Sequence, residues 1–185
     1  LFIDTEAVQG DLDRRKPGQS KITTQRDETD TIQFYSGIFE GQSTGTPIGF
    51  FIKNKDQHSS DYNDLKDVYR PSHADFAYAQ KYGVRDHRGG GRSSARETIA
   101  RVVGGAIAKQ LLAQLNITVQ AYVHSVGTIE VESAYTELDL SKTENNIVRC
   151  PDALVAERMI ARIEEAGRNH DTVGGTISCI IKGVP

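Results

Sequence analysis

The sequence lacks several features that would place it in a broad class of protein. It has no run near the ~18 apolar residues that a membrane-spanning helix needs, so we expect no such helix. It has no charged and then apolar leader at its start, so nothing marks it for secretion. Its formal net charge is −3, which argues against a general nucleic-acid or membrane binder.

Sulfur-containing residues are also few. Cys150 and Cys179, the two cysteines, form no CxxC pair. Two buried thiols in a reducing cytosol are the favoured interpretation, and a single disulfide stays open as the alternative. His and Cys do not cluster at metal-ligand spacing, so we expect no zinc site. The only methionine is Met159, and we therefore interpret the chain as an internal piece of a longer protein.

Hydrophobic periodicity and turn residues divide the 185 residues into elements. We predict a polar loop over 11–26, strands over 31–39 and 46–53 that form a hairpin, a short helix over 72–82, a long helix after Ser94, a strand over 117–131, an exposed connection over 133–149, a helix over 152–166 and a strand over 172–182. This order is not a regular βαβ alternation, so we predict an α+β fold. We expect residues 1–185 to form a single domain that is part of a larger one.

The segment with most glycine, Gly89–Gly91, precedes a helix whose first residues, Ser94-Ala95-Arg96-Glu97, form a capping box with Ser94 as the N-cap. Free N–H groups at a helix start carry partial positive charge and bind phosphate or other anions. Arg92, Ser93 and Arg96 flank this turn. Because the segment matches neither GxGxxG nor a P-loop, an ordinary turn before a capped helix is the alternative.

Basic residues crowd two segments of a chain that is acidic overall. The members are Arg14, Arg15, Lys16, Lys21 and Arg26 in one segment, and Arg85, Arg88, Arg92, Arg96 and Arg101 in the other. Guanidinium groups bind carboxylate and phosphate through two bonds, so a small polyanion explains two local clusters better than a nucleic-acid duplex does. The alternative is solvated charge that pairs with Asp11, Asp13 and Asp86.

One histidine is a candidate for proton transfer. His73 stands in the run Arg70-Pro71-Ser72-His73-Ala74-Asp75, beside an arginine and at a predicted helix start. Imidazole titrates near neutral pH and can give or take a proton. A structural or exposed histidine is the alternative, and it is the interpretation we keep for His58, His124 and His170.

The sequence resembles the chorismate synthase family in four runs that follow the family's order and spacing: DLDRRKPGQSKITTQRDE, GIFEGQSTGTPIGFFIKN, DVYRPSHADFAYAQKYGVRDHRGGGRSSARET and ARVVGGAIAKQLL. The CPD at 150–152 and the ending NHDTVGGTISCIIKGVP are similar to that family as well. The resemblance spans nearly all of the chain. RPxHAD followed by RGGGRSSARET is its most specific part.

The resemblance implies a fold and an activity. The family fold is a sandwich in which antiparallel β-sheets flank a helical layer, and the family enzyme is a cytoplasmic homotetramer. It is a lyase that uses reduced FMN for the anti 1,4-elimination of phosphate from 5-enolpyruvylshikimate 3-phosphate. The product is chorismate, in the shikimate pathway of aromatic amino acid biosynthesis. NADPH is the candidate reductant for the flavin, and no nucleic acid or membrane is implied as a partner.

Matched by motif, the resemblance assigns roles to residues of this chain. The implied roles are proton transfer for His73, FMN binding for Arg92, Ser93 and Ser94, binding of anionic groups of NADPH or substrate for Arg15 and Lys21, and substrate binding for Arg70 and Arg96. Ser72 and Lys21 stand where the family usually has Gly and Arg. The family's GESHG-like turn and its C-terminal half with an RHD motif are not in these 185 residues, so we expect this chain alone to be inactive.

Two other functions stay open on the residues alone. A non-catalytic module that binds anions or flavin would keep these loops, and its full-length protein would lack the family's first histidine and the RHD aspartate. A polyanion-binding surface, for example for RNA, would bind in a salt-dependent way. The net charge of −3 disfavours this last function.

Overall fold

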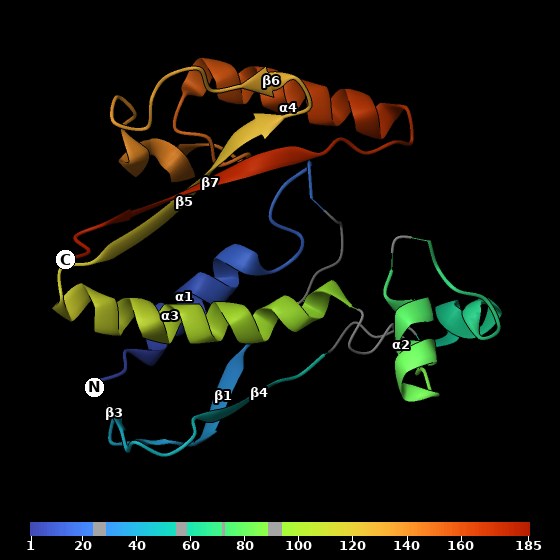
Figure 1. Cartoon of the computed structure of the whole chain (residues 1–185), viewed down its shortest axis with the longest axis horizontal. Helices are drawn as coiled ribbons and strands as arrows, with labels where there is room; N and C mark the ends of the chain where they lie inside the picture. The colour runs from blue at the N-terminus through green and yellow to red at the C-terminus, as the bar shows by residue number, and fades with distance from the viewer. Residues whose placement is uncertain (24–28, 55–58, 72, 89–93) are drawn as a thin grey trace. The chain divides into compact units, whose positions relative to one another are not determined.

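The computed structural model describes residues 1–23, 29–54, 59–71, 73–88 and 94–185. These residues form two compact units, of which the first comprises Leu1–Gly18 and Gln25–Gln110 and the second Gln19–Thr24 and Leu111–Pro185. Each unit combines helices with strand pairs (Figure 1), and every strand pair between described residues is antiparallel. The predicted α+β class is confirmed.

The first unit begins with a helix that the sequence interpretation missed. Its elements are α1 (Thr5–Arg15), β1 (Ile32–Ser36), β2 (Ile38–Phe39), β3 (Gln42–Ser43), β4 (Gly49–Ile52), the 3-10 helix η1 (Ser59–Leu65), α2 (Asp75–Tyr82), the 3-10 helix η3 (Ala95–Glu97) and most of α3 (Thr98–Gln114). The prediction of a loop from residue 11 is wrong up to Arg15. Asp4 caps α1 by accepting hydrogen bonds from two backbone N–H groups, and Val8 and Leu12 are buried one turn apart.

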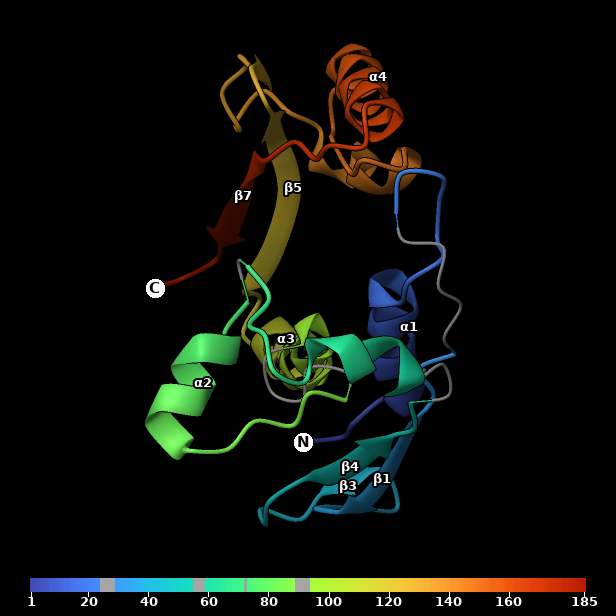
Figure 2. The ribbon, with the colours of Figure 1, turned by 90° about the vertical axis from the view of Figure 1, so that its right-hand side faces the viewer.

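The core of the first unit lies between α1 and α3, which run side by side in Figures 1 and 2. Its buried members are Val8, Leu12, Ile99, Val103 and Ala106, with Ile32, Phe34, Phe50 and Ile52 packed against them from the strands. The β1–β4 pair confirms the predicted hairpin partners, but the strand predicted over 31–39 is divided at Gly37, and its second part, β2, pairs with β3. The helices are antiparallel, because Asp4 N–H donates to Gln110 Oε1 at one end and Arg15 Nε donates to Thr98 Oγ1 at the other.

The starts of the two predicted helices differ from their prediction. The shorter helix, α2, begins at Asp75 rather than at residue 72, and ends as predicted before Gly83, which has a φ of 70°. Ser72, its predicted cap, lies outside the described residues. Ser94 is confirmed as an N-cap, since its Oγ accepts the Arg96 N–H at 3.2 Å, but it caps η3, and α3 follows from Thr98.

The second unit holds a three-stranded antiparallel sheet of order β6-β5-β7, formed by β5 (Thr118–Val126), β6 (Ile129–Glu130) and β7 (Gly175–Lys182). The helix α4 (Ala153–Arg168) contacts β5 and β6. Asp152 caps α4, with its Oδ1 accepting the Val155 N–H at 3.0 Å. The predicted helix is confirmed, and the strand predicted over 172–182 begins at Gly175. The single strand predicted over 117–131 is wrong in its second part, because a turn at 127–128 divides it into β5 and β6, which pair with each other.

The connection between β6 and α4 is less exposed than predicted. It contains the 3-10 helix η4 (Leu140–Asn145), in which Leu140 and Thr143 are buried. Its end joins the core of the second unit, which comprises Val126, Val131, Val148, Cys150, Ala156 and Met159. Cys150 is buried as expected, whereas Cys179 is exposed, and both are free thiols.

Candidate anion-binding site

Arg15, Asp30 and Arg96 meet in the first unit, although they stand far apart in the sequence. Arg15 lies in the last turn of α1, Asp30 lies just before β1, and Arg96 lies in η3. Arg15 Nη1 is 3.1 Å from Asp30 Oδ2, and Arg96 Nη2 is 2.9 Å from Asp30 Oδ1. The Asp30 side chain is 0% exposed and each arginine side chain is 21% exposed. This Asp30 triad therefore has one net positive charge and reaches the surface through its guanidinium groups.

Neutral hydrogen-bond acceptors hold the two arginines as well. Arg15 donates from Nε to Thr98 Oγ1 and from Nη2 to the Ala95 carbonyl, both at 3.3 Å. Arg96 Nη2 donates to the Lys53 carbonyl at 3.1 Å. Because these partners come from η3, the start of α3 and the residue that follows β4 by one position, the packing of the first unit builds the triad.

The two arginines of the Asp30 triad influence each other. Burial lowers the pKa of Arg96 from its ordinary value, and the positive charge of Arg15 lowers this pKa further. Arg96 keeps its proton at neutral pH nevertheless, because a guanidinium group is not deprotonated in proteins. Both side chains are therefore cations in the same small region.

The two oxygens of the Asp30 carboxylate differ in the hydrogen bonds that they accept. Its Oδ1 accepts no well-directed hydrogen bond within the described part of the chain, although Arg96 Nη2 lies at ion-pair distance from it. The short distance is the better guide to their attraction, because the energy between two charges depends on their separation. Charge, rather than a directed bond at this oxygen, holds Arg96 to Asp30.

A second triad, the Asp75 triad, forms within a short stretch of the chain. Arg70 donates from Nε and Nη2 to the two carboxylate oxygens of Asp75, both at 2.9 Å, and Arg85 Nη1 donates to Asp75 Oδ2 at 2.9 Å. Asp75 is 1% exposed. The hydrogen bond to Asp75 raises the pKa of Arg70 above its ordinary value. Arg70, a predicted substrate-binding residue, is thus engaged in a buried two-bond ion pair.

His73 lies exposed in the turn that leads into α2. Its backbone N–H donates to the Arg70 carbonyl at 3.4 Å, and its Nδ1 is 2.9 Å from the Pro71 carbonyl oxygen. A carbonyl oxygen can only accept, so Nδ1 carries a hydrogen, and in the neutral ring Nε2 is the unprotonated nitrogen. Nε2 is therefore the atom of His73 that can take up a proton.

Three further predicted site residues are Lys21, Arg92 and Ser93. Lys21 lies in the second unit, where it forms an ion pair with Glu164, and the hydrogen bond from Lys21 lowers the pKa of Glu164. Arg92 and Ser93 lie outside the described residues. The predicted surface pairing holds for three basic residues, with the pairs Arg14–Asp11 at 3.0 Å, Lys16–Asp13 at 3.5 Å and Arg88–Asp86 at 3.0 Å.

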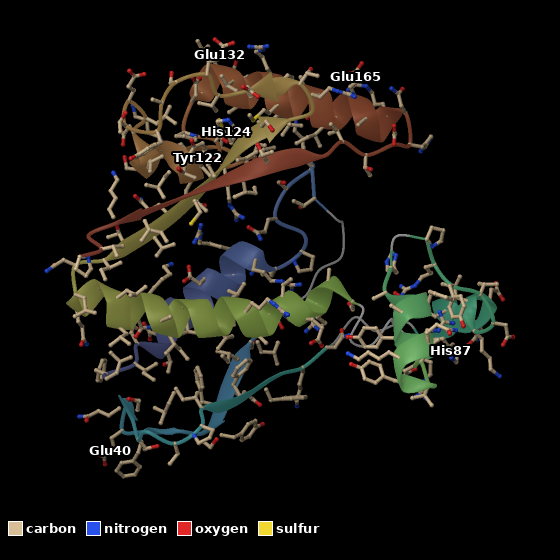
Figure 3. All side chains as sticks on the ribbon, viewed as in Figure 1. Glu40, His87, Tyr122, His124, Glu132 and Glu165 are labelled. Carbon is tan, nitrogen blue, oxygen red and sulfur yellow. The ribbon has the colours of Figure 1, made fainter. Side chains whose placement is uncertain are left out.

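The two buried aspartates are the residues that sequence reasoning missed. Asp75 was open to prediction only as a helix-start residue, since a capping-box spacing says nothing about an ion pair with Arg70. No sequence signal points to Asp30. His124, by contrast, lies on β5 beside Tyr122, with ring centroids 6.0 Å apart (Figure 3), in keeping with a structural histidine.

The described ranges contain no candidate membrane-spanning helix and no candidate metal site. No helix in them is long and apolar enough to cross a membrane. No three His, Cys, Asp or Glu side chains in them are grouped so that they could hold a metal ion. A cavity of about 290 Å³ in the second unit is lined by polar side chains that include Gln19, Glu144 and Arg149, and it contains none of the predicted site residues.

Comparison with known proteins decides the family. The sequence model of chorismate synthase matches residues 1–185. The chain belongs to the chorismate synthase family. It is 61% identical over 185 residues to the chorismate synthase of Christiangramia forsetii and 58% identical to that of Bacteroides thetaiotaomicron, and each match covers 100% of this chain and 52% of the relative.

A crystal structure of chorismate synthase has the same fold. It matches with a TM-score of 0.76 and 29% identity, over 100% of this chain and 51% of the solved one. The predicted fold, α+β with antiparallel sheets and helices as in chorismate synthase, is confirmed by this match. The chain spans about half the length of the curated relatives it matches.

Proposed function

We propose that the full-length protein is a chorismate synthase, a lyase that eliminates phosphate from 5-enolpyruvylshikimate 3-phosphate with reduced FMN to give chorismate. The observation that carries this proposal is the match of the family to all 185 residues, at 61% identity to a named relative. Because the chain spans about half of such relatives, the activity is assigned to the full-length protein, and this chain alone is proposed to be inactive.

The Asp30 triad supports the substrate class. The substrate carries one phosphate and two carboxylates, and arginine binds both groups through paired N–H bonds. Arg15 and Arg96 converge on one place, with side chains that reach the surface and a shared positive charge. We assign them, together with Arg70, to the anionic groups of the substrate. Arg15 and Lys21 are the proposed contacts for anionic groups of NADPH or of the substrate.

The turn before α3 suits an anionic cofactor. Ser94 Oγ accepts the Arg96 N–H and still has a hydrogen to donate, because a hydroxyl is donor and acceptor at once. The backbone N–H groups of Arg96, Glu97 and Thr98 already donate within this turn, so the hydroxyl of Ser94 is the donor that it offers among these residues. This donor fits FMN, and we propose that Ser94 holds it together with Arg92 and Ser93. Reduced FMN bound there would supply electron density to the substrate as phosphate leaves and would recover it afterwards.

His73 is the proposed proton carrier of this half of the protein. The elimination breaks the bond between carbon and the phosphate oxygen and removes a ring proton, so protons must be managed at the leaving group and the flavin. His73 can hold a proton at Nε2 while Nδ1 stays bonded to the Pro71 carbonyl. A positioned histidine of this kind contributes about 10²–10⁴-fold to a rate.

We further propose a cytoplasmic homotetramer whose ligands are small molecules, with no nucleic acid and no membrane among its partners. The family supports this assembly by resemblance. Sedimentation velocity of the full-length protein tests it, since a tetramer and a monomer differ fourfold in mass. A monomer at micromolar concentration would contradict the tetramer.

Anaerobic phosphate release from 5-enolpyruvylshikimate 3-phosphate tests the activity. The full-length protein is assayed with chemically reduced FMN, with oxidised FMN and without flavin. We expect release with reduced FMN alone, and a decrease of about 10²–10⁴-fold in His73→Ala. His170→Asn is the matched control, because His170 is exposed and has a φ of 55°, which asparagine tolerates.

The runner-up function is a non-catalytic module that binds anions or flavin. The same arginine pair would serve it. A folded full-length protein that binds FMN or phosphate, and releases no phosphate under any flavin condition, would support the module and contradict the enzyme. Equal phosphate release with oxidised and with reduced FMN would be consistent with the elimination and would contradict only the requirement for reduced flavin.

A further inference from the structure

We infer that Asp30 is a positioning residue, which holds the guanidinium groups of Arg15 and Arg96 together and so sets how tightly the anionic substrate binds. The inference rests on the proposed function, because it adds a role within the same site. The role follows from the contacts, the burial and the backbone of Asp30.

The charge of Asp30 offsets the repulsion between the guanidinium groups of Arg15 and Arg96. Two guanidinium groups that lie 3.1 Å and 2.9 Å from the two oxygens of one carboxylate are close enough to repel each other strongly. The buried carboxylate offsets this repulsion and leaves a net charge of one. Burial and then the charge of Arg15 lower the pKa of Arg96, as expected for two neighbouring cations. Without Asp30 the pair would separate.

The backbone around Asp30 holds this residue in a fixed position. Its φ of 41° lies in the left-handed region, which aspartate adopts more readily than most residues. Its carbonyl accepts a hydrogen bond from Gln9 Nε2 at 3.3 Å, and Gln9 Oε1 accepts the Ile32 N–H at 3.0 Å. The side chain of Gln9 thereby ties α1 to the start of β1. The backbone therefore fixes the direction of the Asp30 carboxylate, so the carboxylate does not move with the two arginines.

A positioning role and a purely stabilising role of Asp30 predict different effects on substrate affinity. A buried ion pair that only stabilises would, when broken, lower the free energy of unfolding and leave the substrate affinity of the folded molecules unchanged. A positioning group would change affinity in the molecules that remain folded. The substrate KM, read against kcat, distinguishes the two roles.

The test compares Asp30→Asn with Asp11→Asn in the full-length protein. Asp11 is a matched control, because it too is shared by two cations, Arg14 at 3.0 Å and Lys109 at 2.8 Å, and neither cation is a site residue. We expect the substrate KM to rise at least about tenfold in Asp30→Asn, a loss typical for groups that orient a binding residue. In Asp11→Asn we expect KM to stay within about twofold, because neither Arg14 nor Lys109 is assigned to the substrate.

A double-mutant cycle identifies the route of the effect. Arg96→Met is made alone and together with Asp30→Asn. If Asp30 acts through Arg96, its replacement adds little to the KM of the Arg96→Met protein, because neighbouring residues that work as a unit are not additive. Full additivity would show that Asp30 does not act through Arg96 and would overturn the inference.

Two precautions keep the outcome decisive. Should Asp30→Asn fail to fold, Asp30→Glu retains the charge and shifts the carboxylate by one methylene, and an unchanged KM in that variant would overturn the inference. Calorimetric titration with 5-enolpyruvylshikimate 3-phosphate measures affinity without turnover. Weaker binding in Asp30→Asn than in Asp11→Asn then supports positioning even where the proposed reaction fails, and equal binding in the two variants rejects it.

Discussion

The Asp30 triad and the Asp75 triad each place a buried aspartate between two arginines, but they are assembled in different ways. The Asp75 triad is local, since its members lie between residues 70 and 85. The Asp30 triad draws one residue each from the end of α1, the approach to β1 and the turn before α3. The Asp75 triad can form when one short stretch of the chain folds. The Asp30 triad exists only when α1 and α3 are packed together.

The two triads also differ in how their arginines are held. Asp75 receives two short directed bonds from Arg70, and this hydrogen bonding raises the pKa of Arg70. Burial and the charge of Arg15 lower the pKa of Arg96, and Asp30 Oδ1 receives no directed bond within the described residues. A shared carboxylate alone therefore does not decide whether the pKa of an arginine is raised or lowered. Directed bonds favour the charged form of one arginine, whereas desolvation and a like charge disfavour it in the other.

The largest effect is expected at the centre of the local triad. Asp75→Ala should lower the free energy of unfolding by about 3–5 kcal/mol, because it leaves two largely buried arginines without their counter-charge. Urea denaturation of the full-length protein measures this change. Asp86→Ala removes an exposed carboxylate 3.0 Å from Arg88 and should cost at most about 1 kcal/mol. Equal losses would show that the Asp75 triad is no stronger than an exposed pair.

Paired lysine substitutions sharpen the difference in how the arginines are held. Arg70→Lys gives up the two-bond fork to Asp75 and should cost about 1.5–3 kcal/mol of stability, the value of a hydrogen bond to a charged group. Arg96→Lys should cost less stability and raise the substrate KM about tenfold, or about 1.4 kcal/mol of binding. Denaturation midpoints and phosphate-release kinetics separate the two. Reversed outcomes would mean that Arg70, rather than Arg96, dominates substrate binding.

A smaller effect is expected at the turn that carries Arg96. Ser94→Ala removes the oxygen that accepts the Arg96 N–H and should lower the free energy of unfolding by about 1 kcal/mol, a typical loss for an N-cap. Ser94→Asp keeps an acceptor in place and should restore most of that stability. If both variants are as stable as the parent, the cap makes no contribution to holding Arg96.

The smallest effect is expected at Asp11, a partly buried aspartate whose two cationic partners, Arg14 and Lys109, have side chains that are 50% and 49% exposed. Burial alone raises the pKa of the Asp11 carboxyl, but hydrogen bonds and charges from Lys109 and Arg14 outweigh it and the pKa lies below its ordinary value. A carboxyl with a lowered folded pKa adds stability above its unfolded pKa of about 3.9 and loses it as pH falls through the folded pKa. Asp11→Asn should therefore cost up to about 1 kcal/mol at neutral pH. The cost should vanish below both pKa values, and denaturation curves across pH measure it. A cost that persists in acid would not be electrostatic.

Elements with strong local signals could be predicted from the sequence. The hairpin of β1 and β4 follows from β-branched and aromatic residues between glycines, and α4 follows from its apolar periodicity after Pro151. The helix α1 was missed because it is mostly polar. Its two buried residues, Val8 and Leu12, can be recognised as core residues only in the folded structure, where α3 packs on them. The buried end of the connection before α4 was missed for the same reason.

The candidate site divides in a similar way. The motifs around Arg15, Arg70, His73 and Ser94 are readable in the sequence, because each is a short run with its own composition. The partners of these residues are not readable. No periodicity relates Asp30 to Arg15 or to Arg96, and the capping-box spacing before α2 concealed the ion pair of Arg70 with Asp75.

The sequence by itself determined the family, the α+β class and the residue types that meet an anion, because these depend on local composition and on motifs. Only the tertiary structure decided which charges share a carboxylate. The antiparallel packing of α1 on α3 places Arg15 beside the turn that carries Arg96, and the backbone before β1 aims Asp30 between them. Such pairings depend on distances in space, which a chain acquires only when its distant segments have packed.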